Sequence, residues 1–150
     1  MEMISKSLVE TAEFARNFLK QLAKGARSGA MVVALYGDLG SGKTTFTQFL
    51  AKELGVENYV TSPTFVIEKK YVIPAQAGIQ GFKTLIHIDC YRLTAPDEML
   101  HLGWSEIAAD PNNLIVVEWP ERIASILPND CVKIEFKFVG ENEREILVKS

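Results

Sequence analysis

Residues 37–44, with the sequence GDLGSGKT, have the types and spacing needed to bind a phosphate group. They match the pattern G-x-x-x-x-G-K-[ST], in which glycines let the backbone approach a phosphate with no β-carbon in the way. Consecutive N–H groups of such a loop form an anion-binding concavity at the N-terminus of a helix. Lys43 can reach the β- and γ-phosphates, and the Thr44 hydroxyl can ligate Mg²⁺. The sequence therefore predicts that the chain binds ATP or GTP.

Two acidic residues end apolar runs and are candidates for the remaining chemistry. Asp89 closes LIHID and Glu118 closes LIVVE. In an open α/β sheet both carboxylates would reach the carboxyl edge, where the phosphate loop also lies. A nucleotide hydrolase of this type needs one acid to help hold Mg²⁺ and a group that orients the attacking water. Spacing leaves open which acid takes which role, so both are candidate metal ligands together with Thr44.

Other polar residues give weaker signals. Ser62 and Thr64 flank a proline in a predicted loop, where either a nucleotide-sensing role or plain loop structure would account for them. His87 lies in the middle of an apolar strand and is more typical of a core histidine than of a catalyst. Trp119 follows Glu118 at a strand end, where core packing is the default. The pair Tyr91-Arg92 fits either an ion pair beside a helix or phosphate sensing.

The elements around the phosphate loop follow the order that such a loop requires. Residues 31–36 (MVVALY) form a continuous apolar run, as in a buried parallel strand. After the loop, apolar residues at 46, 49, 50 and 54 recur at helical spacing, and Gly55 is a stop signal. The local pattern is therefore strand, loop and helix.

The rest of the chain alternates predicted strands and helices. A short strand is expected at about 3–8, and Thr11 or Ser7 could cap a helix from about 12 to 26. The fold class predicted from this alternation is α/β, a three-layer domain with a mainly parallel central sheet and a C-terminal antiparallel hairpin. The further expected elements are strands at 66–72, 83–89 and 114–118, helices from 96, at 104–109 and at 120–127, a surface loop at 73–82, and a hairpin of 132–139 with 144–149.

Composition indicates one soluble globular domain over residues 1–150. The net charge of −3 argues against a strong autonomous grip on nucleic acid, and 47% hydrophobic content is ordinary for a soluble protein. No signal peptide and no 18-residue apolar span is recognisable, so no membrane association is expected. Two isolated cysteines suggest neither a disulfide framework nor a zinc site, which favours a reducing cytoplasm.

Four motifs together resemble the TsaE family, the small bacterial P-loop ATPases of tRNA threonylcarbamoyladenosine biosynthesis. They are GDLGSGKTTF at 37–46, SPTF at 62–65, HIDCYRL at 87–93 and VEWPER at 117–122. Their order and approximate spacing also resemble the family, and the resemblance covers nearly the whole chain. One departure is the segment 72–82, which is longer than family members usually carry between these strands.

The resemblance implies roles for individual residues. Glu118 resembles a second ligand of Mg²⁺, direct or through water, and Asp89 resembles the essential acid of the family. Thr64 would act as a switch-like residue near the γ-phosphate, Thr11 resembles the segment that borders the adenine, and Trp119 resembles the family's functional tryptophan. The loop residues that would bind the phosphates of ATP are Gly37, Asp38, Leu39, Gly40, Ser41, Gly42, Lys43, Thr44 and Thr45, with Thr44 also on Mg²⁺.

The same resemblance implies partners. TsaE-like proteins associate with TsaD-like and TsaB-like proteins, and their ATP turnover supports repeated cycles of modification. Contact with tRNA would be only indirect, through that complex. Low intrinsic ATPase activity is expected.

Two other functions are weighed against this one. A small-molecule P-loop kinase usually carries an arginine-bearing lid, whereas this chain has five dispersed arginines and no compact arginine-rich insert. A non-catalytic nucleotide-gated binding module would keep its partner function without Asp89 and Glu118. The absence of an N/T-K-x-D guanine motif favours ATP over GTP.

Overall fold

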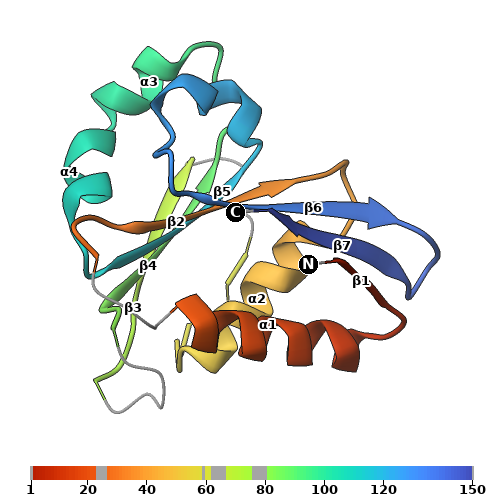
Figure 1. Ribbon diagram of the computed structural model, residues 1–150. Helices are drawn as coiled ribbons and strands as arrows, with labels where there is room; N and C mark the ends of the chain where they lie inside the picture. Colours follow the sequence, from red (N-terminus) through yellow and green to blue (C-terminus); the bar gives the residue numbers. More distant parts are fainter. Residues whose placement is uncertain (1, 23–26, 59, 62–66, 76–80, 150) are drawn as a thin grey trace.

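The computed structural model describes residues 2–22, 27–58, 60–61, 67–75 and 81–149. Helices separate most of the strands along the chain, and a pair of strands closes it, as Figure 1 shows. The elements are β1 (Glu2–Ser5), α1 (Leu8–Leu22), β2 (Met31–Tyr36), α2 (Lys43–Glu53), β3 (Glu68–Val72), β4 (Thr84–Asp89), α3 (Pro96–His101), α4 (Trp104–Ala109), β5 (Asn113–Glu118), the 3₁₀ helix η1 (Pro120–Ile126), β6 (Val132–Phe138) and β7 (Arg144–Lys149).

One seven-stranded sheet runs through the molecule in the order β1-β7-β6-β2-β5-β4-β3. The pairs β6–β2, β2–β5 and β5–β4 are parallel, whereas β3 and the β6–β7–β1 group pair antiparallel. The central strands β2, β4 and β5 are almost wholly buried, which explains their continuous apolar sequences. The predicted α/β class, parallel centre and C-terminal hairpin are confirmed.

Helices cover the sheet on both faces and create two separate cores (Figure 1). On one face α1 and α2 pack over alternate residues of the central strands, around a cluster of phenylalanines. On the other face α3, α4 and η1 cover the intervening residues. Because successive strand residues point to opposite faces, each apolar run fills both cores at once. The three-layer arrangement predicted from the sequence is therefore the one observed.

Several predicted boundaries were wrong, for local reasons. The first strand ends at Ser5, whose hydroxyl donates to the carbonyl of Ser7, 2.8 Å away. The first helix begins at Leu8, since the Ser7 hydroxyl accepts the Glu10 N–H and acts as the N-terminal cap. Residues 23–26, in which this helix was expected to end, lie outside the described residues.

The segment after β5 is helical, as predicted for residues 120–127. Residues 120–126 form a 3₁₀ helix with a kink at Ile123. Its cap, Trp119, has φ +56°, a left-handed conformation that is uncommon for a residue with a β-carbon. The tight turn directs the chain away from the sheet edge immediately after Glu118.

The ends of the predicted loop at 73–82 lie close together. The Ile73 N–H donates to the carbonyl of Lys83 at 2.9 Å, and the side chains of Ile73 and Phe82 are both buried. Residues 76–80 of this segment lie outside the described residues. Among the described helices, none is long and apolar enough to cross a membrane.

Candidate functional site

The two acids predicted from strand ends lie side by side. Asp89 and Glu118 are register partners at the ends of the parallel strands β4 and β5. On its other edge β5 pairs with β2, in which Leu35 lies opposite Glu118, two residues before the phosphate loop begins. Parallel pairing thus brings both carboxylates and the loop to one edge of the sheet, as the sequence predicted.

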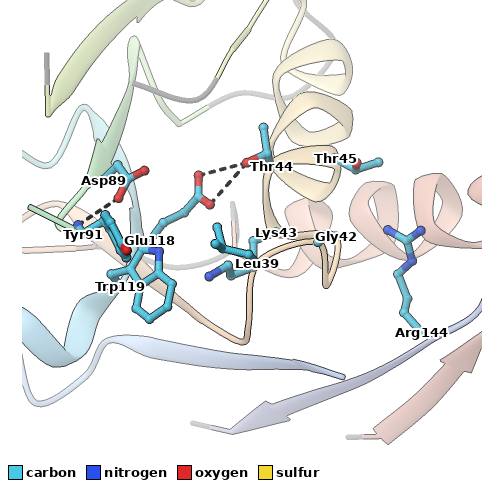
Figure 2. A pocket seen from close by; sticks show the side chains of 11 residues that line it. Leu39, Gly42, Lys43, Thr44, Thr45, Asp89, Tyr91, Glu118, Trp119 and Arg144 are labelled. Atoms are coloured by element: carbon cyan, nitrogen blue, oxygen red, sulfur yellow. Dashed lines mark hydrogen bonds between the residues drawn. The ribbon is translucent and has the colours of Figure 1, made fainter. Parts of the chain in front are cut away.

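A cavity of about 520 Å³ opens at this edge (Figure 2). Its volume lies within the usual range for small-molecule sites. The residues that line it come from the phosphate loop, from α2, from the ends of β4 and β5, and from β7. They are Leu39, Gly40, Gly42, Lys43, Thr44, Thr45, Asp89, Tyr91, Glu118, Trp119 and Arg144.

The backbone of the loop is shaped for close approach. Gly37 has φ +146°, and a β-carbon there would lie 2.6 Å from the Phe136 carbonyl oxygen. Gly42 has φ +105° and caps α2 without any side-chain hydrogen bond. The first N–H groups of a helix have no partner within the helix, so an anion can accept them. The loop and the start of α2 therefore fit a phosphate group.

Lys43 is held at the mouth of this loop. Lys43 is only 5% exposed, and its ammonium group donates to the Gly37 carbonyl oxygen. The same nitrogen lies 4.3 Å from the centre of the Trp119 ring, which is a cation–π contact. An ammonium group has three donors, so Lys43 can keep the Gly37 contact and still donate to a phosphate.

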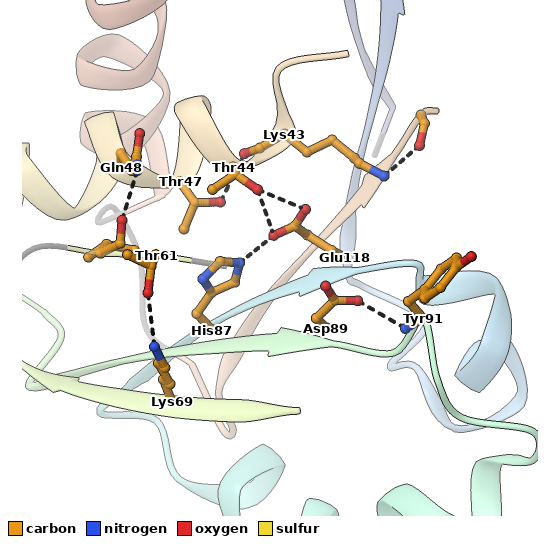
Figure 3. Close-up of polar contacts among 12 residues, drawn as sticks. Lys43, Thr44, Thr47, Gln48, Thr61, Lys69, His87, Asp89, Tyr91 and Glu118 are labelled. Atoms are coloured by element: carbon orange, nitrogen blue, oxygen red, sulfur yellow. Dashed lines mark hydrogen bonds and ion pairs between the residues drawn. The ribbon is translucent and has the colours of Figure 1, made fainter. Parts of the chain in front are cut away.

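Glu118 is the centre of a buried polar network (Figure 3). The Thr44 hydroxyl donates to its two carboxylate oxygens at 3.3 and 3.4 Å. On the other side, His87 Nε2 lies 2.5 Å from Glu118 Oε2, with His87 completely buried. His87 Nδ1 has no hydrogen-bond partner among the described residues. Within that part of the chain, Glu118 is therefore the single side-chain partner of the His87 ring. The histidine orients this carboxylate toward Thr44.

Asp89 and the two aromatic residues form the wall beside Glu118. Asp89 is 8% exposed, and its Oδ1 accepts the Tyr91 N–H at 2.9 Å. The rings of Tyr91 and Trp119 are tilted by 59°, with their centres 5.2 Å apart. Trp119 therefore contacts both Tyr91 and the Lys43 ammonium, and it lies between the strand ends that carry the acids and the phosphate loop.

Cys90 directly follows Asp89 but does not add a reactive group. Burial raises the pKa of its thiol to about 12, and the charges of Asp89 and Glu121 contribute in the same direction. The side chain is completely buried in the second core. A thiol that is buried and neutral near pH 7 is a poor nucleophile and a poor metal ligand. Both cysteines are free and buried.

The donor set fits Mg²⁺ only in combination with a nucleotide. The hydroxyl of Thr44 and the carboxylates of Glu118 and Asp89 supply hard oxygen atoms at one end of the cavity. Within the described ranges no group of three or more His, Cys, Asp or Glu side chains converges as a self-sufficient metal site. Mg²⁺ commonly takes one or two protein ligands and completes its shell with phosphates and water.

Not every predicted site residue reaches this cavity. Gly37, Asp38 and Ser41 line a separate, adjacent pocket on the β6 side of the loop. Thr11 lies elsewhere, completely buried, with its hydroxyl 2.6 Å from the Ser5 hydroxyl and bonded to the Ser7 carbonyl. The structure thus gives Thr11 a role at the start of α1 and does not place it at the cavity. Thr64 lies outside the described residues.

The structure also brings in residues that sequence reasoning had not assigned to the site. The strand pattern placed His87 in the core, where it does lie, but its contact with Glu118 depends on the register of β4 and β5. The sequence around Tyr91 fits two roles and does not decide between them. Arg144 is one of five dispersed arginines in the sequence, and no local signal connects the closing hairpin with the phosphate loop.

The chain is similar in sequence to proteins of one family. Residues 5–146 match the family model "Threonylcarbamoyl adenosine biosynthesis protein TsaE". The chain is 34% identical over 148 residues to the tRNA threonylcarbamoyladenosine biosynthesis protein TsaE of Treponema pallidum, covering 99% of both chains. It is 41% identical over 115 residues to the protein of that name from Bacillus subtilis, covering 77% of this chain and 66% of the relative.

A solved structure is similar as well. The chain superposes on the crystal structure of Bacillus subtilis YdiB with a TM-score of 0.64 and 31% sequence identity. The match covers 97% of this chain and 82% of YdiB. The similarity therefore extends over nearly the whole of this chain.

Proposed function

The chain belongs to the TsaE family, and from this membership we propose that it binds Mg²⁺ and ATP and hydrolyses the ATP in tRNA threonylcarbamoyladenosine biosynthesis. In this role it would be a cytoplasmic subunit that supports turnover of a complex of TsaD-like and TsaB-like proteins. Its contact with tRNA would be indirect, through that complex. The family resemblance and the geometry of the cavity are independent supports for the two parts of the proposal.

One observation carries the catalytic part. The phosphate-loop residues Lys43 and Thr44 share a single cavity with Asp89 and Glu118, which come from two other strands. A phosphate-binding loop alone would support nucleotide binding. Carboxylates placed beside it add what hydrolysis requires, a metal-side oxygen and a group that can orient water.

The contacts suggest a division of work among these residues. The loop N–H groups and Lys43 bind the phosphates and stabilise the negative charge that develops as the terminal bond breaks. Thr44 and Glu118, already in contact, hold the metal side, where Mg²⁺ would neutralise phosphate charge. Asp89, on the neighbouring strand, orients the water that attacks the γ-phosphate. The products are ADP and inorganic phosphate.

Comparison with a kinase also favours hydrolysis. All five arginines are described, and Arg144 alone among them lines the cavity. A phosphotransfer enzyme generally needs several cations over the transferred group and a second substrate pocket. A screen for phosphate transfer to nucleosides and metabolites tests this alternative, and a phosphorylated product would overturn the hydrolase assignment.

Replacing Lys43 tests the nucleotide site. The variant Lys43→Ala should bind ATP about 10- to 100-fold more weakly, because a charge-assisted hydrogen bond contributes roughly 1.5–3 kcal/mol. Isothermal titration calorimetry and phosphate release would measure the affinity and the turnover. Lys52→Ala removes the same charge from an exposed position of the same helix and should leave both unchanged. ATP affinity and turnover unaltered in Lys43→Ala would refute the site.

The partner assignment needs its own experiment. A pull-down with a TsaD-like and a TsaB-like protein in ATP, in ADP and without nucleotide should show association in at least one state. Association that depends on the nucleotide would connect the cavity to the complex. Failure in all three states would remove the proposed cellular role and leave the nucleotide site to be judged by calorimetry.

A further inference from the structure

The guanidinium group of Arg144 lies directly against the phosphate loop. Arg144 is the first residue of β7, and a β-carbon built on Gly42 would lie 2.1 Å from its terminal nitrogen NH1 and 3.0 Å from its central carbon. The guanidinium thus occupies the space that the missing side chain of Gly42 leaves open. A residue more than 100 positions from Gly42 in the sequence therefore forms part of the cavity wall.

This guanidinium has a donor that the protein does not use. NH1 is buried and has no hydrogen-bond partner in the described part of the chain, and no carboxylate there forms an ion pair with Arg144. A buried donor left without an acceptor destabilises the folded chain, and the cost is larger when the group is charged. Folding alone gives no reason to keep such a cation in this place, whereas an anionic ligand in the cavity does.

The position of Arg144 decides which part of the ligand it meets. Figure 2 shows it beyond Gly42 and Thr45, on the side of the loop away from Asp89 and Glu118. In the proposed function, the terminal phosphate lies toward the two acids. The opposite end of the triphosphate, next to the nucleoside, therefore lies toward Arg144.

We propose that Arg144 binds the α-phosphate of the nucleotide and anchors ATP and ADP alike. The inference rests on the proposed nucleotide site and adds a second cation to it. A guanidinium can give two parallel hydrogen bonds to phosphate oxygens, so the unsatisfied donor acquires an acceptor on binding. Because ATP and ADP share the α-phosphate, Arg144 contributes to affinity and not to the chemical step.

The test compares Arg144→Gln and Arg144→Lys with the wild-type chain. For Arg144→Gln, calorimetry should show affinities for ATP and ADP reduced by about tenfold or more, to a similar extent, since a charge-assisted contact is lost. The loss of turnover should be large at low ATP and smaller at saturating ATP, because weaker binding raises KM more than it lowers kcat. Arg144→Lys keeps the charge without the planar fork and should recover part of the affinity. Arg16→Gln, which removes the same charge from an exposed position on α1, is the matched control.

The outcomes separate this inference from the function on which it rests. Equal nucleotide affinity in Arg144→Gln and wild type, with both folded by circular dichroism, would overturn the inference alone. A loss confined to ATP with ADP unchanged would place Arg144 at the γ-phosphate and overturn it as well. Inorganic tripolyphosphate should also bind Arg144→Gln more weakly, and unchanged binding of this probe would show stacking on the base and contradict the phosphate contact. Failure of the wild-type chain to bind either nucleotide would overturn the proposed function itself.

Discussion

The two ends of the cavity are built in opposite ways. At the acid end, Glu118 contacts Thr44 and His87, and Asp89 accepts the Tyr91 N–H, so the carboxylates are oriented by the protein itself. At the other end, NH1 of Arg144 is buried without a partner among the described residues. A satisfied polar network holds its groups in one geometry, whereas an unsatisfied donor is stabilised only when a ligand supplies an acceptor. The comparison suggests that the acid end governs the rate and the arginine end governs affinity.

The largest expected effect comes from Glu118→Gln. The variant keeps the shape of the side chain but removes its charge. Turnover of ATP should therefore fall by at least about 100-fold, which is the lower end of the effect of a positioned catalytic carboxylate. The affinity for ADP in the absence of Mg²⁺ should stay within about threefold of wild type. Phosphate release and calorimetry provide the two measurements. If ADP affinity without metal fell as far as turnover, the proposed separation between the two ends would be wrong.

A smaller effect is expected from changing the support of Glu118. His87→Leu removes the group that faces the buried carboxylate, and leaving a buried polar group without its partner costs roughly 1–3 kcal/mol of unfolding free energy. His87→Gln retains a donor that can reach the carboxylate and should lose less. Urea denaturation of both variants gives the comparison. Equal losses in the two would mean that packing of the ring, and not its contact with Glu118, stabilises this end.

The smallest effect is a spectroscopic one, at the contact between the two ends. The chain has two tryptophans, so Trp104→Phe leaves Trp119 as its single fluorophore of this type. If a phosphate draws the Lys43 ammonium from its place 4.3 Å from the Trp119 ring, adding ATP or ADP should change the emission of Trp119. The double variant with Lys43→Ala should show little change. An emission insensitive to saturating nucleotide would mean that Lys43 keeps its contact with the ring.

Much of the fold could be predicted because its signals are local. Continuous apolar runs identified the buried strands β2, β4 and β5, and alternation identified the closing hairpin. A helix at 120–127 was also predicted, but the sequence did not indicate its 3₁₀ form or the left-handed backbone of Trp119 that precedes it. Trp119 contacts Lys43 and Tyr91, and such tertiary contacts can hold a residue in an uncommon backbone conformation.

The site divides along the same line. Lys43, Thr44, Asp89 and Glu118 could be named in advance, since a loop motif and two strand ends mark them in the sequence. The role of Thr11 rests on a short resemblance alone, and the structure places this residue in the first turn of α1 and not among those that line the cavity. His87 carried a signal for the core only, because its contact with Glu118 joins two strands 31 residues apart.

The sequence by itself determined the phosphate loop, the strands that carry the acids, the class of the fold and the family. Each of these features is encoded by residues close together in the sequence, through the conformations open to glycine, the spacing of apolar residues and the length of each apolar run. Tertiary structure alone decided that His87 supports Glu118 and that Arg144 of β7 lies against Gly42. Both contacts depend on strand order and register, which arise from contacts between distant segments. The residues next to His87 and Arg144 in the sequence therefore do not indicate them.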